Sequence, residues 1–356
     1  MTRLDRARAE LAAEGVGGLV VGAGPDLAYL TGYHAMPLER LTALVLTPST
    51  AALVVPRLEA PRVEPSPDLE LVVWEETEDP LRLVADRLGG ARRVAVDGRL
   101  RATFLLGLQE RLSGVEWLVA DGLLGPLRLR KDPTELELLA RASAAADRVI
   151  PALAELRMSG RTEREIARIV ADLLVEAGHD TVEFVIVAAG PNAASPHHEP
   201  TDRVVEVGDT VVVDFGGSID GYHSDTTRTF VVGPPDPEIA AAHAALRAAQ
   251  EAAVDAVAPG VPAASIDAVA RDLLTRAGYG EEFVHRTGHG IGLEVHEPPY
   301  LVAGNATPLE PGMVFSVEPG IYRAGRWGMR IEDIVAVDET GAVRLNRTDR
   351  RLYVVD

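Results

Sequence analysis

The sequence predicts a chain of two domains, an α/β domain followed by a larger α+β domain. Its 356 residues exceed what one ordinary hydrophobic core supports. Strand and helix patterns alternate over roughly the first 125 residues, whereas a repeat of helical and then β-patterned sequence fills the remainder. A helix start at Asp132 and Pro133 separates the two regions, and we place the domains at 1–127 and 128–356.

The first domain is predicted from short apolar runs that Gly, Pro and Asp residues interrupt. These runs predict strands at 15–23, 69–75 and 92–98, a hairpin at 41–47 and 51–56, and helices at 79–90 and 102–112. Gly22 and Gly24 begin a stretch similar to a dinucleotide-binding loop, but Leu27 occupies the place of its third glycine. The sequence therefore gives little support for a bound dinucleotide.

The second domain contains two similar segments, 159–178 and 259–278, with matching Gly, Ile, Asp-Leu-Leu and Ala-Gly positions. A helical segment precedes each copy, at 134–157 and 236–257, and β-patterned sequence follows each, at 182–232 and 282–337. A helix end followed by glycine is common and explains part of this similarity. The shared order of elements favours a duplication, and two such halves would join around one central site.

Composition and charge exclude several classes of protein. The net charge of -19 disfavours nucleic acid as a partner, and the absence of cysteine excludes disulfides, thiolate zinc sites and cysteine nucleophiles. The charged N-terminal segment lacks the apolar region of a secretory signal, and no apolar run is long enough to span a membrane. We expect a cytoplasmic protein without a nucleic-acid or membrane partner.

Two acidic residues, Asp214 and Asp225, lie on apolar runs that a turn-rich segment separates. If the hairpin folds symmetrically at Ile219 and Asp220, the two carboxylates face each other with Cβ atoms about 5 Å apart. Like charges at this separation destabilise a sheet.

Glu318 and Glu332 repeat this pattern on a second pair of apolar runs, with Gly325 at the midpoint. Buried carboxylates cost several kcal/mol or become protonated unless they are compensated. Arg228 and Arg330 lie near in sequence, but divalent cations compensate better. A solvated strand charge is the simpler interpretation of any one acid, whereas two symmetrical hairpins favour a metal site.

Four carboxylates exceed the usual complement of one transition-metal ion, so we predict two divalent ions with bridging carboxylates. Oxygen ligands with one imidazole favour Mn²⁺ or Co²⁺, with Zn²⁺ and Fe²⁺ as alternatives. Strand alternation leaves open an arrangement in which Asp225 and Glu332 face water instead.

Three of the nine histidines fall within residues 283–299. His289 lies between Gly288 and Gly290, which let the backbone approach an ion closely, and it is the ligand candidate. His285 and His296 are then left to transfer protons or to stabilise charge.

Five motifs resemble, in order and type, the ligand set of the pita-bread metallopeptidases, the family of methionine aminopeptidase, aminopeptidase P and prolidase. They are VDFGG, HSDTTRTF, TGHGIG, VEPGIY and RIED, and they contain Asp214, Asp225, His289, Glu318 and Glu332. The resemblance covers residues 128–356 and implies a pita-bread catalytic domain with two metal ions.

The resemblance also implies roles for the remaining site residues. VHEPP puts His296 at the family's catalytic histidine, and PHHEP puts His197, or its neighbour His198, in the site. Asp225 and Glu332 would bridge the ions, Glu318 would relay protons, and His296 would hold the oxyanion. His197 and His285 would bind substrate or shuttle protons, with support from Arg330 and Tyr322.

The N-terminal region, including DLAYLTGY, is similar to the creatinase-type α/β domain, which methionine aminopeptidases lack. It implies the proline-specific branch, whose members cleave Xaa-Pro bonds and are usually homodimers. Creatinase shares both domains but lacks the metal ligands, and all five are present here. We favour an Xaa-Pro dipeptidase, because the N-terminal region is compact and the sequence predicts no third domain.

Three alternatives remain beside the dipeptidase. An aminopeptidase P would remove the residue before proline from longer peptides, and another hydrolase would cleave a non-peptide amide. A non-catalytic binding protein on the same fold is predicted to have damaged ligands or a basic surface. The residues of the recess for the proline ring are not predicted.

Overall fold

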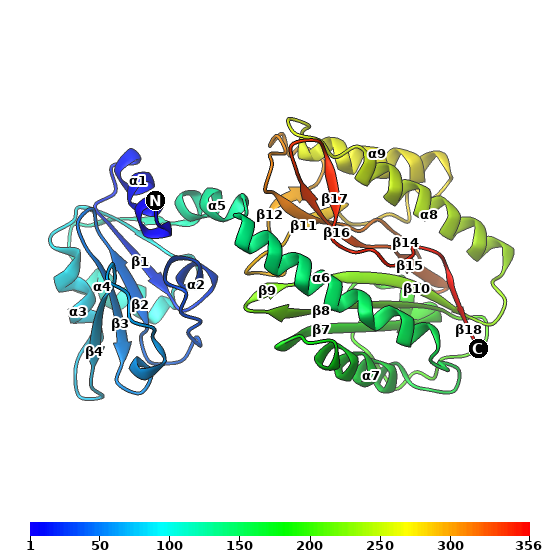
Figure 1. The fold of residues 1–356 in the computed structure, drawn as a ribbon, viewed down its shortest axis with the longest axis horizontal. Helices are drawn as coiled ribbons and strands as arrows, with labels where there is room; N and C mark the ends of the chain where they lie inside the picture. Colours follow the sequence, from blue (N-terminus) through cyan, green and yellow to red (C-terminus); the bar gives the residue numbers. More distant parts are fainter. The chain divides into compact units, whose positions relative to one another are not determined.

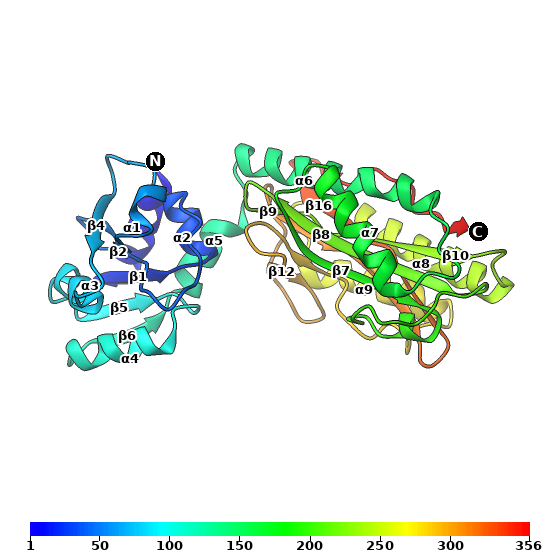
Figure 2. The same cartoon turned by 90° about the horizontal axis from the view of Figure 1, so that it is seen from below.

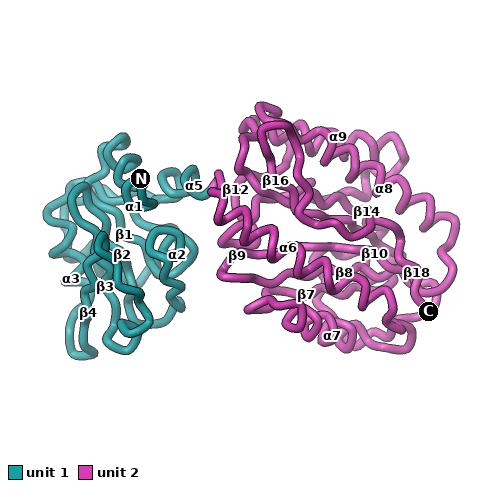
Figure 3. The backbone as a smooth tube through the Cα atoms, in the orientation of Figure 1, with its two compact units in different colours: residues 1–128 teal, residues 129–356 magenta.

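The computed structural model describes residues 1–356 and consists of two compact units, Met1–Arg128 and Leu129–Asp356 (Figure 3). The division lies one residue beyond the boundary predicted between residues 127 and 128. Neither unit contains a helix that is both long enough and apolar enough to cross a lipid bilayer.

The first unit is built on a six-stranded sheet with strand order β4-β3-β2-β1-β5-β6. Figure 1 labels β1 to β4, and Figure 2 labels β5 and β6. The central strands β1, β2 and β3 pair antiparallel, whereas β4, β5 and β6 join the sheet in parallel. All five predicted strands and both predicted helices are present. The elements are α1 (Arg3–Ala13), β1 (Gly18–Gly22), α2 (Pro25–Thr31), β2 (Ala43–Leu46), β3 (Ala51–Pro56), η1 (Ala60–Arg62), β4 (Glu70–Trp74), α3 (Pro80–Leu88), β5 (Arg93–Val96), α4 (Ala102–Arg111), β6 (Glu116–Val119) and α5 (Asp121–Leu129).

The first half of the second unit places two helices against a mixed sheet of order β18-β10-β8-β7. In both views α6 runs along β8, and α7 lies beside β7 (Figures 1 and 2). The elements are α6 (Pro133–Ala154), α7 (Glu163–Glu176), β7 (Thr181–Ala189), η2 (Gly190–Ala194), β8 (Thr210–Ile219), β9 (Tyr222–His223), β10 (Thr226–Val232) and the C-terminal β18 (Tyr353–Val355).

The second half repeats this plan with a sheet of order β12-β11-β13-β16-β17 and a separate two-stranded ribbon, β14-β15. Helix α9 contacts β12, and α8 contacts β13 and β14. The elements are α8 (Pro237–Asp255), α9 (Ala263–Arg276), β11 (Gly288–Gly290), β12 (Glu297–Leu301), β13 (Val314–Val317), β14 (Gly320–Arg323), β15 (Trp327–Arg330), β16 (Asp333–Val337) and β17 (Ala342–Arg344).

The structure agrees with the predicted duplication. Helices α7 and α9 begin and end at positions that differ by 100 residues. The turn before each helix is fixed in the same way, because Gly160 N donates to Val205 O at 3.0 Å and Gly260 N donates to Leu309 O at 2.7 Å. Each half therefore has its own helix-on-sheet core, and the site lies on the sheet surfaces that the helices leave free.

Candidate metal centre

The first acidic pair lies on the hairpin of β8, β9 and β10, but its register differs from the prediction. The turn is at Asp220 and Gly221, which have φ values of 51° and 79°. Such a two-residue turn with both φ values positive is favoured by the sequence Asp-Gly. Asp214 therefore pairs with Thr227, and the prediction that Asp214 directly faces Asp225 is wrong.

The corrected register still brings the two carboxylates to one face of the sheet. Asp225 lies two positions from Thr227, the cross-strand partner of Asp214, and side chains two apart on a strand share a face. A diagonal pair is farther apart than a directly facing pair and leaves room between the carboxylates. Both residues are buried, which excludes the alternative that Asp225 faces water.

The second acidic pair has the predicted register. Val317 pairs with Asp333, and Gly320 pairs with Arg330, so Glu318 and Glu332 lie opposite each other between the two ladders. Glu332 is 1% exposed and therefore does not face water.

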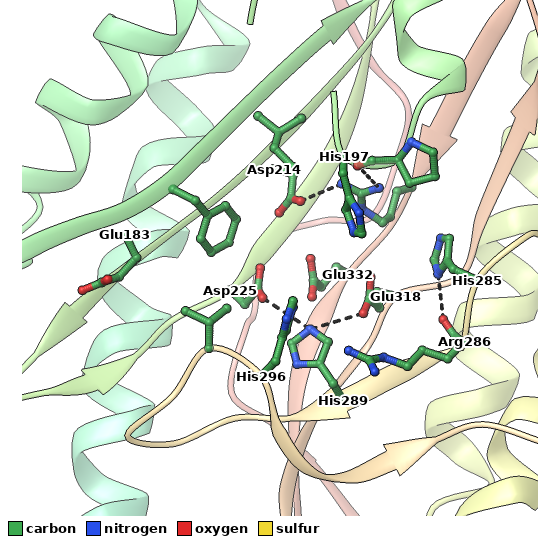
Figure 4. A pocket seen from close by; sticks show the side chains of 15 residues that line it. Glu183, His197, Asp214, Asp225, His285, Arg286, His289, His296, Glu318 and Glu332 are labelled. Atoms are coloured by element: carbon green, nitrogen blue, oxygen red, sulfur yellow. Dashed lines mark hydrogen bonds and ion pairs between the residues drawn. The ribbon is translucent and has the colours of Figure 1, made fainter. Parts of the chain in front are cut away.

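His289 lies at the centre of β11, between strands β12 and β13. The flanking glycines serve the sheet, because a Cβ at Gly288 would lie 1.9 Å from Ser316 O and one at Gly290 would lie 2.2 Å from Pro298 O. The two glycines are therefore explained by strand packing, and not by close approach of the backbone to an ion as predicted. They let three strands pack closely while the imidazole of His289 points into the site (Figure 4).

The side chains from both halves converge in the site that Figure 4 shows. Three sets of ligand atoms each lie within 4.8 Å of one another: Asp214, Asp225 and Glu332; His289, Glu318 and Glu332; and Asp225, His289 and His296. His289 Nε2 is 3.3 Å from Glu318 Oε1 and 3.6 Å from Asp225 Oδ2. All five predicted ligands therefore belong to one cluster.

Arginine neutralises little of this cluster. Arg330 Nη2 lies 2.6 Å from Asp214 Oδ2, but Arg228 contacts the carbonyl of Glu332 rather than its carboxylate. Glu332 accepts one hydrogen bond, from Thr227 Oγ1 at 2.7 Å. Asp214 Oδ1 and Glu332 Oε1 are buried without a hydrogen-bond partner. Buried carboxylate oxygens without partners are costly unless a cation is bound.

Asp333, the residue after Glu332, is a buried carboxylate that arginines neutralise. Its oxygens contact Arg228, Arg344 and Arg350. Burial acts to raise the pKa of Asp333, but these arginines hold it below the usual value. Glu332 has no such partners.

Electrostatics within the cluster favour a bound divalent cation. Burial, and then the neighbouring carboxylates, raise the pKa values of Asp225 and Glu332 well above their usual range. Burial also raises the pKa of Glu318 to about 7 and, with nearby His296, lowers that of His289 to about 3. A neutral imidazole and crowded carboxylates are the donor set that divalent ions take, so the residues present fit the predicted group.

His285, Tyr322 and Arg330 form a hydrogen-bonded chain at one wall of the site. Arg330 Nη1 donates to Tyr322 Oη at 2.8 Å, and Tyr322 Oη lies 2.8 Å from His285 Nε2. His285 Nδ1 lies 2.7 Å from Arg286 O, a carbonyl that can only accept. His285 is therefore a neutral ring that donates from Nδ1 and accepts at Nε2, and burial lowers its pKa to about 4.

The remaining histidines take different positions. His296 is an exposed residue, and its ring lies edge-on to that of His289 with a centroid separation of 4.0 Å. His197 lines the cavity, whereas the neighbouring His198 points away and contacts Glu163. Of the two alternatives left open by the sequence, the structure therefore puts His197 in the site.

The cluster lines a cavity of about 680 Å³, and some of the other lining residues were not predicted. Apolar Phe184, Ile186 and Val295 line it together with charged Glu183 and Arg286. Phe184 and Ile186 lie two residues apart on β7, so both side chains point to the same face of the sheet. That spacing was visible in the sequence, but a sequence alone does not tell which face of a strand borders a cavity.

Two family models match the chain, and they divide it as the two units do. The Creatinase/Prolidase N-terminal domain matches residues 3–130, and Metallopeptidase family M24 matches residues 137–339. The chain belongs to metallopeptidase family M24. Membership confirms the predicted metal-dependent peptidase and implies divalent ions at the carboxylate cluster.

Individual relatives match the chain over nearly its full length. A probable dipeptidase PepE of Mycobacterium tuberculosis is 49% identical over 360 residues, which cover 99% of this chain and 96% of that protein. An Xaa-Pro dipeptidase of Pyrococcus furiosus is 34% identical over 310 residues, 87% of this chain and 88% of that protein.

A solved structure supports the fold in the same way. The recombinant prolidase from Thermococcus sibiricus matches with a TM-score of 0.94 and 37% identity, over 99% of this chain and 98% of that one. The predicted pita-bread catalytic domain with a creatinase-type N-terminal domain is confirmed.

Proposed function

We propose that this M24 metallopeptidase is a dinuclear-metal hydrolase that cleaves the Xaa-Pro bond of dipeptides. The observation that carries the proposal is the buried carboxylate cluster, which has unpartnered oxygens and lines a cavity. The similarity to the P. furiosus Xaa-Pro dipeptidase and to the T. sibiricus prolidase supports this substrate.

Asp214, Asp225, His289, Glu318 and Glu332 would hold two divalent ions, with Asp225 and Glu332 as bridges. The sets of nearby ligand atoms support the two bridging roles, because Glu332 and Asp225 each belong both to the set that contains Asp214 and to a set that contains His289. When bound, the ions would polarise the scissile carbonyl and lower the pKa of water toward neutrality. Oxygen-rich donors with one imidazole support Mn²⁺ or Co²⁺, before Zn²⁺ or Fe²⁺.

The surrounding side chains would bind the substrate and move its protons. Glu318 accepts a hydrogen bond from Ser316 at 3.2 Å, which leaves its second oxygen to relay a proton. His296, an exposed residue that lines the cavity, would donate to the oxyanion, and a donor of this kind is typically worth about 10²–10³ in rate. His197 and His285 would contact the substrate, and Arg330 with Tyr322 would fix the ring of His285.

An Xaa-Pro peptide lacks the amide N–H at proline, so its recognition depends on ring packing rather than on strand-like hydrogen bonds. Phe184, Ile186 and Val295 provide apolar cavity walls of the kind that a pyrrolidine ring requires. We assign the proline recess to these three side chains.

The test is turnover of Ala-Pro against Ala-Pro-Ala by metal-stripped protein resupplied with Mn²⁺, with Asp225→Asn as the metal-site control. Cleavage of the dipeptide alone is the expected result. Preferred cleavage of the tripeptide would make the chain an aminopeptidase P. If neither is cut while metal analysis shows both sites filled, the proline proposal fails and a different amide, or a non-catalytic role, takes its place.

The homodimer and the cytoplasmic location are further proposals, which follow from the proline-specific branch and from the sequence. Sedimentation velocity at micromolar concentration tests the first, and fractionation of the source cells tests the second. A monomer at all concentrations, or recovery outside the cytoplasm, would overturn the corresponding proposal.

A further inference from the structure

Glu163, the first residue of α7, is a buried carboxylate outside the metal cluster. Its side chain is 0% exposed and forms no ion pair with an arginine or lysine. Five hydrogen bonds reach it instead, from Ala189 N (2.8 Å), Asn192 Nδ2 (3.0 Å), His198 Nε2 (2.8 Å), Thr201 N (2.9 Å) and Thr201 Oγ1 (2.6 Å). Burial acts to raise the pKa of Glu163, but the bonds from Thr201, Ala189 and His198 hold it below the usual value.

All five donors belong to one segment, residues 189–201, which we call the histidine loop. Ala189 and Thr201 are its two ends, and Asn192 and His198 lie between them. One carboxylate thus contacts both ends of the loop and its middle. His197, the cavity-lining histidine, belongs to this loop.

The opposite side of the histidine loop rests on the second half of the catalytic unit. Arg330 Nη1 donates to Pro196 O at 3.3 Å, and the backbone of Gly328 packs against Ala193. His197 lies between Pro196, which the site arginine contacts, and His198, which Glu163 contacts. Its position in the cavity is therefore set from both sides.

We propose that Glu163 is a positioning residue that holds His197 in the substrate cavity through His198 and the ends of the histidine loop. The proposal rests on the function proposed above for the role of His197. Glu163 itself contacts neither the cavity nor the candidate metal ligands.

The chemistry of the five donors makes a carboxylate necessary. A glutamine at position 163 would turn an NH₂ group toward either Ala189 N or Thr201 N, depending on its orientation. Neither backbone N–H can become an acceptor, so one bond is lost and the loop end is pushed away. Hydroxyl rotation at Thr201 and a change of tautomer at His198 would not restore it.

The matched control lies on the same helix end. Glu165 is exposed and accepts a hydrogen bond from Thr162 N at 2.7 Å within the capping box, without contact to the histidine loop. Glu163→Gln and Glu165→Gln therefore change the same helix terminus by the same chemical step, and only the first reaches His197.

The first experiment measures kcat and KM for Ala-Pro with Mn²⁺-loaded variants. Since a displacement of about 1 Å can cost ~10² in rate, Glu163→Gln is expected to lower kcat about 10-fold to 100-fold. Glu165→Gln stays within about twofold of the parent because it leaves the loop unchanged. Metal content measured by mass spectrometry is expected to be unchanged in both.

A double-mutant cycle separates positioning from a general structural effect. In a His197→Ala background, Glu163→Gln is expected to add less than about threefold, because the side chain it positions is absent. Full multiplication of the two effects, or loss of metal from Glu163→Gln, would overturn the proposal. Should Glu163→Gln not fold, His198→Gln replaces it, and unchanged kcat in that variant likewise overturns the proposal.

A second readout does not depend on turnover. The side-chain NMR resonances of His197, assigned by comparison with His197→Ala, are expected to shift in Glu163→Gln and to stay in place in Glu165→Gln. If the parent cleaves no Xaa-Pro peptide, the proposed function fails while this readout still decides the positioning role. Unshifted His197 resonances in folded Glu163→Gln protein would sink it.

Discussion

The two halves of the second unit, Leu129–Asp356, each fix a histidine-bearing segment, but the contacts that fix it differ. Each has a buried carboxylate on its second helix that fixes a histidine-bearing segment. In the first half Glu163 takes five hydrogen bonds directly from the histidine loop. In the second half Asp267 accepts from Thr287 N and Oγ1, and from Arg271, which itself donates to the carbonyls of Phe283 and His285.

The difference lies in what each segment carries. The segment held by Asp267 continues from Thr287 directly into His289, a candidate metal ligand, and it also includes His285. The histidine loop held by Glu163 carries no candidate ligand. The first half thus positions a group on the substrate side of the site only. The second half positions groups on both the substrate side and the metal side.

The largest expected effect tests whether the halves contribute equally to the ions. Asp225→Asn and Glu332→Gln each remove one proposed bridge, one from each half, so each is expected to lower kcat/KM by roughly 10³-fold or more and to reduce bound metal. Metal stoichiometry and Ala-Pro turnover measure this. A variant that keeps two ions and substantial turnover would show that its half does not supply a bridge.

A smaller effect is expected from Asp267→Asn. The change weakens the hold on Arg271 and Thr287, and loss of a partner that orients a ligand typically costs about 10-fold to 100-fold in metal affinity. Competition with a metal chelator measures the affinity. Glu163→Gln is the control, since it acts on the half without His289, and equal loss of affinity in both variants would break the comparison.

The contact between the halves is tested by Gly328→Ala. A Cβ at Gly328 would lie 1.9 Å from Ala193 O, an atom of the histidine loop's backbone, so the loop must move. Overpacking of this kind costs about 1–3 kcal/mol, and turnover should fall with the displacement of His197. Thermal unfolding and kcat measure the two effects.

Gly325→Ala, on the same ribbon, is the control for Gly328→Ala. Gly325 has φ +70° and nothing within 4 Å of the added Cβ, so only backbone strain of about 1 kcal/mol is expected, without loss of turnover. Equal kinetic loss in both variants would mean that the ribbon acts as a whole and not through its contact with Ala193.

The smallest expected effect concerns helix capping, in which the halves also differ. Thr162 caps α7 with a reciprocal bond to Glu165, whereas Pro262 at the start of α9 provides no side-chain cap. Thr162→Ala should lower the free energy of unfolding by about 1 kcal/mol, and Ser265→Ala, at the position equivalent to Glu165, by much less. Denaturant unfolding measures both. A large loss from Ser265→Ala would reveal a cap that the structure does not contain.

Much of the site could be predicted because strand register follows from symmetry around a turn. The midpoint at Gly325 correctly places Glu318 opposite Glu332. In the first hairpin the predicted turn, Ile219-Asp220, lies one residue before the observed turn, because Asp220-Gly221 is the stronger two-residue turn sequence. That signal was present in the sequence.

The anchoring carboxylates were missed for a different reason. Glu163 and Asp267 lie near helix starts, where acidic residues commonly interact with the helix terminus. Their spacing gives a clue, because Glu163 shares a helix face with buried Ile166 and Val170. An acid on an apolar stripe indicates a buried partner. The partners of Glu163 lie 26 or more residues away, and Thr287, which Asp267 contacts, lies 20 residues away, so only the tertiary structure identifies them.

The division of the proposed ligands between two repeated halves has a consequence for the origin of the chain. One half supplies only Asp214 and Asp225, and the other supplies Glu318, Glu332 and His289. If a gene duplication produced the repeat, an ancestral single-half polypeptide could have assembled such a carboxylate cluster only as a pair of identical chains. Fusion would then have freed each copy to change independently, so that one half came to provide aspartates and the other glutamates with an imidazole.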